Sequence, residues 1–507
     1  MTGPVTGPAA RHDAVVVGGG IAGLTAAYEL TRAGLRPLVL EARGYVGGLI
    51  AGARIGGVPV DIGAEAWAVR RPEVADLVEE LGLRVQAPGG ASWVRGADGR
   101  TVRIPERAML GIPQQPADRD VLEALGPVDA ARASRDLTMA MSRDDAQRLS
   151  AGDLATLVTE RMGAATLATL VGPVAGGIHS ADPALLSVAA VLPGLPDALL
   201  EHRSLARAVR ALRDAAPPGP AVATVDGGMA RLTAALADAI RAAGGEVRTR
   251  FGARGLRRAG GGAGPSNWEV VAVPTRPAAD PAAEPEPAGE PVVLRTPLVI
   301  LAAGAQVAER LLADAAAGAG SSAPLPRLEL TPGAPITHLS LALDAPELDA
   351  APRGSGLLVA PGSPGVGAKA LTHLTIKWPW VAQAARAAGH PHRHVLRLSY
   401  GRSGEPTPQV GVADALADAS ELLGVDLTAE MVADHRLVRW GGALAPDTPQ
   451  ARATASVLEA RVREDAAFVG LRVTGAWVAG TGIAAIVPHA RDAARDAARD
   501  AARRTAY

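Results

Sequence analysis

Buried-strand and helix patterns alternate at the start of the chain. Residues Ala14–Val17 are all apolar and end in Gly18, which is typical of a parallel strand buried on both faces. A helical pattern follows over residues 21–33, and a second apolar run, Pro37–Leu40, ends at Glu41. A strand, a helix and a strand within about 30 residues predict a βαβ unit.

The pattern then changes several times along the chain. Residues 72–212 are mostly helical in period, strand and helix signals return over 221–249, and 298–303 is another apolar run that ends at a glycine. Alternating segments between 336 and 439 predict an antiparallel sheet with one solvated face. A long helix rich in alanine and arginine closes the chain. Pieces of one nucleotide-binding fold therefore occur at the start, middle and end, with other domains inserted between them.

We predict an α/β fold in which a Rossmann-like domain is assembled from three separate segments. These segments are 11–71, 220–335 and 440–507, and the inserted parts are a helical domain over 72–215 and an antiparallel-sheet substrate domain over 336–439. Glycines, prolines and acidic residues crowd the stretch between 260 and 291. Such a composition buries little apolar surface, so residues 275–290 are predicted to be a disordered insert, and 268–273 one strand of a hairpin.

Composition excludes several classes of protein. The 507 residues include no cysteine, which rules out disulfide scaffolds, cysteine-ligated metals and a cysteinyl-linked flavin. Redox chemistry would therefore need a bound organic cofactor. A net charge of −1 gives no basic footprint for nucleic acid. Residues 1–10 lack the pattern of a signal peptide, and glycine and proline interrupt the uncharged stretch 162–181, so we expect a cytoplasmic protein.

The first chemical motif is the glycine spacing between the first strand and the first helix. Gly18 permits the tight turn, Gly20 lets a pyrophosphate approach the backbone, and Gly23 packs the helix on the strand. The helix then directs unpaired N–H groups at the phosphates. Glycine-rich turns without a ligand share this spacing. Glu41, 18 residues after Gly23 at a strand end, favours the nucleotide because its carboxylate can accept both ribose hydroxyls.

Further motifs carry a resemblance to a known superfamily. The run Glu41-Ala42-Arg43, the pair Gly47-Gly48 and the block DIGAE at 61–65 resemble the two-dinucleotide-binding-domain flavoproteins, which include monoamine oxidases, phytoene desaturases and protoporphyrinogen oxidases. The resemblance implies FAD as the cofactor, with the glycine pair over its pyrophosphate. Leu49 stands where an arginine or lysine is usual, which puts one phosphate salt bridge in doubt.

Four blocks narrow the resemblance. They are GPVAGGI at 172–178, KALTH at 369–373, KWP at 377–379 and WVAGTGI at 477–483. They are similar to bacterial oxygen-dependent porphyrinogen oxidases, and most similar to the Gram-positive, high-GC group that acts on coproporphyrinogen III. The resemblance implies dehydrogenation of coproporphyrinogen III to coproporphyrin III in haem synthesis, with O₂ as electron acceptor and hydrogen peroxide as product.

Other functions stay open at this point. The alternatives are a protoporphyrinogen IX oxidase, a flavin amine oxidase or carotenoid desaturase, and a flavin-bound scaffold that hands porphyrin to the next haem enzyme. A transient contact with that next enzyme and a peripheral contact with a membrane are also left open. No contact with nucleic acid is expected.

The resemblance also implies cofactor contacts, residue by residue. Residues 63–66 would lie beside the flavin, Ala253 would contact adenine through its backbone, and Trp440 would lie near the ring system. The helix that begins near Gly482 would direct its positive dipole at the N1/O2 edge of the flavin. The full predicted set is Gly18, Gly19, Gly20, Ile21, Ala22, Gly23, Glu41, Ala42, Gly48, Leu49, Gly63, Ala64, Glu65, Ala66, Ala253, Trp440, Gly482, Ile483, Ala484 and Ala485.

The substrate implied by the resemblance is an apolar macrocycle rimmed by four propionates, so it needs a wide apolar cleft with cations at the rim. Ile178 and His179 are predicted to line that cleft, and Arg71 and Lys377 to pair with propionates. Each has a structural alternative: core packing for Ile178, a loop contact for His179, a solvated surface position for Arg71 and a strand-end role for Lys377.

No catalytic side chain and no metal are predicted, because hydride transfer to flavin N5 depends mainly on position and exclusion of water. The ten histidines include no metalloprotease-type spacing. His390, His392 and His394 occupy every second position where a loop is expected to lead into a strand. A metal site at these three histidines is the alternative.

Overall fold

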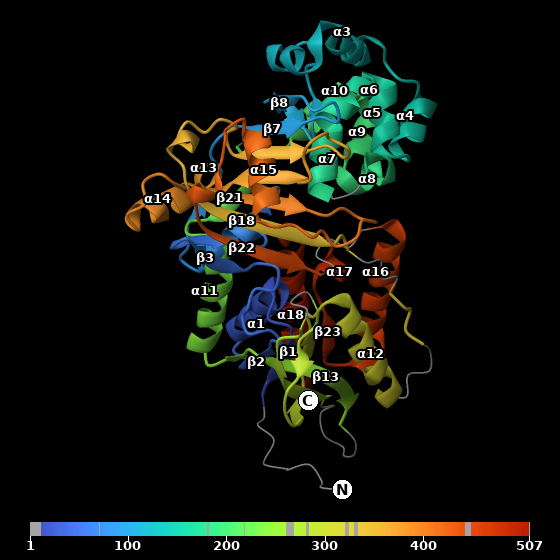
Figure 1. Cartoon of the computed structure of the whole chain (residues 1–507). Coiled ribbons are helices and arrows are strands. Elements are labelled where there is room, and N and C mark those ends of the chain that lie inside the picture. Colours follow the sequence, from blue (N-terminus) through green and yellow to red (C-terminus); the bar gives the residue numbers. More distant parts are fainter. Residues whose placement is uncertain are drawn as a thin grey trace.

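The computed structural model describes residues 12–69, 71–179, 182–216, 219–259, 268–279, 283–319, 324–328, 333–441 and 448–505. Three parts follow one another along the molecule (Figure 1). A helical domain lies at the top, a large β-sheet lies in the middle, and a parallel sheet with its covering helices lies at the bottom. The chain passes between these parts several times, as the three-segment prediction requires.

Five parallel strands form the sheet of the nucleotide-binding domain. Their order is β12 (Glu246–Arg248), β2 (Pro37–Leu40), β1 (Ala14–Val17), β17 (Val299–Leu301) and β23 (Leu471–Val473). Helices α1 (Ile21–Arg32), α11 (Met229–Ala242) and α18 (Ile483–Thr505) cover one face. Ala14 and Val16 of β1 face these helices, whereas Val15 and Val17 face a second, antiparallel sheet that covers the other side. Because β1 has no solvated side, it needs apolar residues throughout.

The second sheet packs on the other face, together with α12 (Ala305–Ala319). It contains β13 (Phe251–Arg258), β14 (Trp268–Arg276), β15 (Glu286–Pro287) and β16 (Val292–Thr296). The disorder predicted for residues 275–290 is wrong where the structure describes them. Thr275 and Arg276 continue β14 and pair with Pro287 and Glu286 of β15.

Hydrogen bonds to the backbone of neighbouring segments hold this insert in place, although it has few apolar side chains to bury. Thr275 donates its N–H to the carbonyl of Arg250 and its hydroxyl to the carbonyl of Ala42. These partners come from other elements, so a reading of local composition does not detect them. Residues 280–282 lie outside the described part of the chain.

The large sheet has seven strands. Their order is β22 (Val432–Trp440), β18 (Ile336–Asp344), β21 (Arg393–Tyr400), β20 (Ala370–His373), β19 (Gly356–Val359), β7 (Ser92–Arg95) and β8 (Thr101–Arg103). Two features differ from the prediction. The strands β7 and β8 come from the segment predicted to be helical, and β7 runs parallel to β19, whereas every other neighbouring pair is antiparallel.

The helical domain follows these two strands. It comprises α3 (Arg119–Thr138), α4 (Arg143–Ser150), α5 (Leu154–Met162), α6 (Ala164–Thr166), a π-helical turn (Leu167–Val171), α7 (Gly172–His179), α8 (Val188–Val191), α9 (Leu195–His202) and α10 (Leu205–Asp214). In the parts of the chain that the structure describes, no helix is both long and apolar enough to cross a bilayer.

Shorter elements connect the three parts. The strands are β3 (Gly52–Ile55), β4 (Val58–Asp61), β5 (Trp67–Ala68), β6 (Val85–Gln86), β9 (Ala108–Met109), β10 (Ile112–Pro113) and β11 (Val222–Val225). The helices are α2 (Glu73–Glu80), α13 (Leu374–Lys377), α14 (Pro379–Ala387), α15 (Val412–Leu423), α16 (Pro449–Glu464) and α17 (Ala476–Ala479).

A buried carboxylate holds the helical domain together. Asp136 of α3 is 1% exposed, and its Oδ1 accepts a hydrogen bond from Arg161 at 2.7 Å. Its Oδ2 accepts from the hydroxyl of Ser204 at 2.7 Å and from the N–H of Ala206 at 2.8 Å, at the start of α10. One side chain thus joins α3, α5 and α10.

Asp136→Asn is expected to destabilise the protein by about 3 kcal/mol, because Arg161 keeps a largely buried charge without its partner. The measurement is the melting temperature followed by circular dichroism. Glu123→Gln is the control, since it breaks the Arg119–Glu123 pair whose side chains are 92% and 64% exposed. An exposed pair of this kind contributes about 0.5 kcal/mol. Similar shifts in the two variants would contradict the prediction.

Candidate cofactor and active site

The turn between β1 and α1 has no room for side chains. Gly18 has a φ of 108°, and a Cβ there would lie 2.6 Å from the carbonyl oxygen of Ala302. A Cβ on Gly23 would lie 1.9 Å from the carbonyl oxygen of Gly18. Both glycines therefore do what their spacing predicts: the first makes the turn and the second lets α1 pack directly on it.

A cavity of about 640 Å³ opens over this turn. A Cβ on Gly20 would meet only the Cα of Gly48, at 4.0 Å, so this backbone faces open space. Gly20 is also the N-cap of α1 and supplies no side-chain cap, which leaves the first N–H groups of the helix for a ligand. These features fit a pyrophosphate at the helix N-terminus.

Glu41 ties the turn to the end of β2. Its Oε2 accepts the N–H of Gly19 and its Oε1 accepts the N–H of Arg43, both at 2.7 Å. Burial raises the pKa of this carboxyl, and the two backbone hydrogen bonds oppose that shift. Each oxygen still has a lone pair for a ribose hydroxyl. Glu41 therefore shapes the turn as well as facing the cavity.

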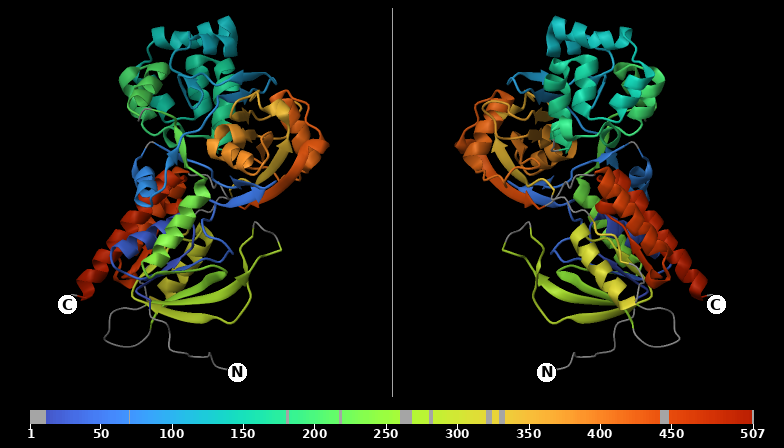
Figure 2. Two further views of the ribbon diagram at one scale, coloured as in Figure 1. Left: turned by 90° about the vertical axis from the view of Figure 1, so that its left-hand side faces the viewer. Right: turned by 90° about the vertical axis from the view of Figure 1, so that its right-hand side faces the viewer.

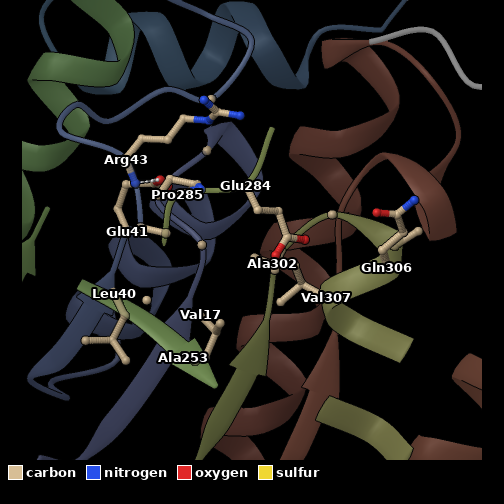
Figure 3. A pocket seen from close by; sticks show the side chains of 18 of the residues that line it. Val17, Leu40, Glu41, Arg43, Ala253, Glu284, Pro285, Ala302, Gln306 and Val307 are labelled. Atoms are coloured by element: carbon tan, nitrogen blue, oxygen red, sulfur yellow. Dashed lines mark hydrogen bonds between the residues drawn. The ribbon is translucent and has the colours of Figure 1, made fainter. Parts of the chain in front are cut away.

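Six of the predicted cofactor residues line this cavity: Gly18, Gly20, Glu41, Ala42, Gly48 and Ala253. Gly19 contributes its N–H to Glu41, whereas Ile21, Ala22 and Gly23 are buried in α1 behind the turn. The sequence analysis missed the outer wall, where Arg254, Glu284, Pro285 and Arg310 lie. No motif marks these residues, because only the packing of the second sheet and α12 brings them near β1 and β2. Figure 3 shows two of them, Glu284 and Pro285, beside Glu41 and Arg43.

A second cavity of about 1130 Å³ adjoins the first and shares Ala42, Arg43 and Gly48 with it. Leu49 and Trp440 also line it. Five arginines border this space: Arg43, Arg241, Arg250, Arg436 and Arg439. The surroundings are therefore cationic even though Leu49 carries no charge.

The predicted flavin segment packs against Leu49 and Trp440. The N–H of Ala64 donates to the carbonyl of Leu49 at 2.8 Å. A Cβ on Gly63 would lie 2.0 Å from that carbonyl oxygen and 3.2 Å from Cζ2 of Trp440. The indole N–H of Trp440 in turn donates to Nδ1 of His338 at 3.3 Å. Tertiary structure thus brings these five residues, from three separate parts of the chain, to one place.

Glu65 forms a buried ion-pair cluster beside this segment. Its Oε1 lies 2.6 Å from Nζ of Lys377, and its Oε2 lies 2.7 Å from Nη2 of Arg397. Burial alone raises the pKa of Glu65, but Arg397 and Lys377 outweigh it and bring the pKa down to about 2. Lys377 therefore already has a carboxylate partner within the chain, and its predicted contact with a propionate stays a prediction.

Several residues predicted to bind the flavin or the substrate do not line either cavity. Gly482, with a φ of 105°, precedes α18, whose first residues are Ile483, Ala484 and Ala485. Arg71 is exposed just before α2. Ile178 is 52% exposed on α7, and the side chain of His179 lies outside the described part of the structure.

The histidines considered as a metal site make other contacts. His394 lies 2.8 Å from His373 and 3.0 Å from Asp349, and His392 lies 2.7 Å from the same Asp349. Within the residues that the structure describes, no cluster of three or more potential ligands could hold a metal ion.

The glycine turn, the acid at the end of β2 and the cavity between the two sheets define a dinucleotide-binding protein. The chain belongs to the family of flavin containing amine oxidoreductases, which matches residues 21–502. Members of this family bind FAD, so FAD is the cofactor and the protein is a flavin-dependent oxidoreductase. The open backbone at Gly20, the carboxylate of Glu41 and the cationic surroundings fit this cofactor.

Individual relatives point to porphyrinogen oxidases within the family. A protein of Mycobacterium tuberculosis named coproporphyrinogen III oxidase is 30% identical over 489 residues, which cover 93% of this chain and 94% of the relative. A crystal structure from Exiguobacterium sp., provisionally assigned as a protoporphyrinogen oxidase, has a TM-score of 0.74 and 22% identity, covering 96% of this chain and 98% of its own. Cyclohexylamine oxidase from Brevibacterium oxydans shares the fold, with a TM-score of 0.60 and 17% identity over 96% and 99% of the two chains.

Glu41→Ala is expected to lower FAD affinity about 100-fold. The variant loses the carboxylate that accepts two backbone N–H groups and that would accept the ribose hydroxyls. Hydrogen bonds to a charged group contribute about 1.5–3 kcal/mol each, and about 2.7 kcal/mol corresponds to a 100-fold change in affinity. The measurement is the ratio of flavin to protein absorbance after gel filtration, with titration of the apoprotein. Glu246→Gln, at the start of the neighbouring strand β12, is the control. Full flavin absorbance in Glu41→Ala would contradict this role.

Proposed function

We propose that this protein is an FAD-dependent oxidase that converts coproporphyrinogen III to coproporphyrin III in haem synthesis. The observation that carries the proposal is the similarity, over 93% of the chain, to a relative named coproporphyrinogen III oxidase. Protoporphyrinogen IX oxidation is the second candidate, favoured by the name given to the Exiguobacterium structure.

The reaction removes six electrons and six hydrogens from the macrocycle in three equal steps. Each step reduces one O₂ to one hydrogen peroxide, so three of each are turned over per porphyrin. FAD, when bound, supplies the hydride acceptor. The task of the chain is then to hold a ring carbon in position and to exclude water. Each step also releases one proton from the macrocycle, and the peroxide takes up a proton in return, so the protons balance over the cycle. Hydride transfer depends more on position and dryness than on acid or base help.

The chain offers apolar residues that could hold the macrocycle and cationic residues that could bind its propionates. Leu49 and Trp440 line the second cavity, and Gly63 packs closely against both of them. Ile178, half exposed on α7, offers an apolar surface for the macrocycle, and His179 follows it. Arg71 is exposed, which leaves its charge available to a propionate. Lys377 would reach a propionate only in competition with Glu65.

The purified protein is expected to be yellow, with the absorbance bands of oxidised flavin. In air it should generate porphyrin fluorescence from coproporphyrinogen III faster than from protoporphyrinogen IX, with hydrogen peroxide formed in a ratio of three to one porphyrin. The measurement follows both substrates side by side with a peroxide assay. A flavin-loaded preparation that oxidises neither porphyrinogen would refute the proposal, and a preference for protoporphyrinogen IX would favour the second candidate.

Arg71→Ala is expected to raise the KM for coproporphyrinogen III by about twofold to fivefold, since an exposed charge pair contributes up to about 1 kcal/mol. The effect on protoporphyrinogen IX should be smaller, because that substrate has two carboxylates instead of four. Arg84→Ala is the control: this arginine follows α2 and pairs with Asp226. Equal changes for the two substrates would leave Arg71 outside the propionate shell.

A further inference from the structure

The hairpin that was predicted to be disordered borders both cavities. Ala283, Glu284 and Pro285 line the first cavity. Ala283 and Pro285 also line the second, together with Pro277 and Ala278. Figure 2 shows this hairpin, in yellow-green, projecting from the second sheet alongside the nucleotide-binding domain. We call residues 277–279 and 283–285, the described residues between β14 and β15, the hairpin tip. No nucleotide-binding motif includes them.

Three arginines from three different elements contact the tip. Arg254 of β13 donates from Nη2 to the carbonyl of Pro285 at 2.7 Å. Arg43, just after β2, donates to the carbonyl of Ala283 at 3.4 Å. Arg310 of α12 lies 3.7 Å from the carboxylate of Glu284. The pair between Arg310 and Glu284 is weak by itself, because partly exposed ion pairs contribute little. The hydrogen bond from Arg254 is short and charge-assisted, which makes it the stronger contact. Together the three contacts hold the tip against the strand ends and the helix that surround the first cavity.

The position of the tip relative to Glu41 indicates which part of the cofactor it covers. Figure 3 shows Glu284 and Pro285 between Glu41 and Arg43 on one side and Val307, near the start of α12, on the other. Glu41 is the ribose acceptor, and Ala253, the predicted adenine contact, lines the same cavity. The adenosine half of FAD would therefore lie under the tip. Proline at 285 presents a rigid apolar ring and no N–H donor.

We propose that residues 283–285 form the outer wall of the adenosine end of the FAD site and slow the release of FAD. This inference rests on FAD occupying the first cavity, as the proposed function requires. For the adenosine to leave, the tip must give up its contacts with Arg43, Arg254 and Arg310. The tip therefore acts on cofactor retention and not on the chemical step.

Replacing residues 277–285 with Asn-Gly removes the wall and keeps the hairpin. Arg276 and Glu286 pair directly across the two strands, so a two-residue turn can join them. The expected result is FAD release at least tenfold faster, measured as the rise in flavin fluorescence after dilution of the holoprotein. An unchanged release rate would overturn the inference.

A matched pair of point variants tests the wall without a deletion. Glu284→Gln weakens the contact with Arg310, and about twofold faster release is expected. Glu286→Gln is the control, because Glu286 pairs with Arg276 at 2.9 Å on the same hairpin and lines neither cavity. Equal acceleration in both variants would mean that hairpin stability, and not the wall, controls release, and would overturn the inference.

FMN separates an adenosine wall from a general effect on the pocket, because FMN lacks adenosine. In the Asn-Gly variant the apoprotein should lose affinity for FAD at least tenfold and keep its affinity for FMN. Parallel losses would overturn the inference. The melting temperature of the apoprotein verifies that the variant is folded. Release of FAD that depends on the tip, in a protein that oxidises no porphyrinogen, would refute the proposed function and leave this inference standing.

Discussion

The carboxylate of Glu41 is the contact on which the nucleotide site depends. It accepts two backbone N–H groups, from Gly19 in the turn and from Arg43 after β2, and so sets the distance between the two strand ends. The cavity lies directly over this link. A buried carboxylate is costly unless its oxygens are hydrogen-bonded, and here two backbone N–H groups supply those bonds. The fold itself therefore holds this carboxylate at the edge of the cavity.

A second set of buried carboxylates joins the nucleotide-binding domain to the large sheet. Asp61, at the end of β4, accepts the N–H groups of Met229 and Ala230 at the start of α11, at 2.7 and 3.0 Å. Burial raises its pKa to about 6, although these hydrogen bonds and Arg397 oppose the shift. Four residues further on, Glu65 pairs with Lys377 of α13 and Arg397 of β21. The segment expected to lie beside the flavin is thus held at one end by backbone N–H groups of α11 and at the other by charged side chains of α13 and β21.

The hairpin shows why composition alone misjudged one segment. Residues 275–290 have few apolar side chains, and by themselves they would not bury enough surface to fold. In the protein their backbone pairs across β14 and β15, and their carbonyls accept hydrogen bonds from Arg43 and Arg254. A segment can therefore be ordered by partners that its own sequence does not contain. The same reasoning applies to β7, which pairs with β19, and to β8, which pairs with β7, although a helical pattern surrounds both strands.

Local patterns were enough to predict β1, α1 and β2, the role of Gly18 and Gly23, and the acid at the end of β2. In each case the physical requirement acts over a few residues: an unbroken apolar run on a strand buried on both faces, a positive φ or a missing Cβ. The meeting of Leu49, Gly63 and Trp440, the pairing of Lys377 with Glu65 and the outer wall at Glu284 and Pro285 could not be predicted in this way. They depend on distances between segments hundreds of residues apart, and only the packing of the sheets on one another determines those distances.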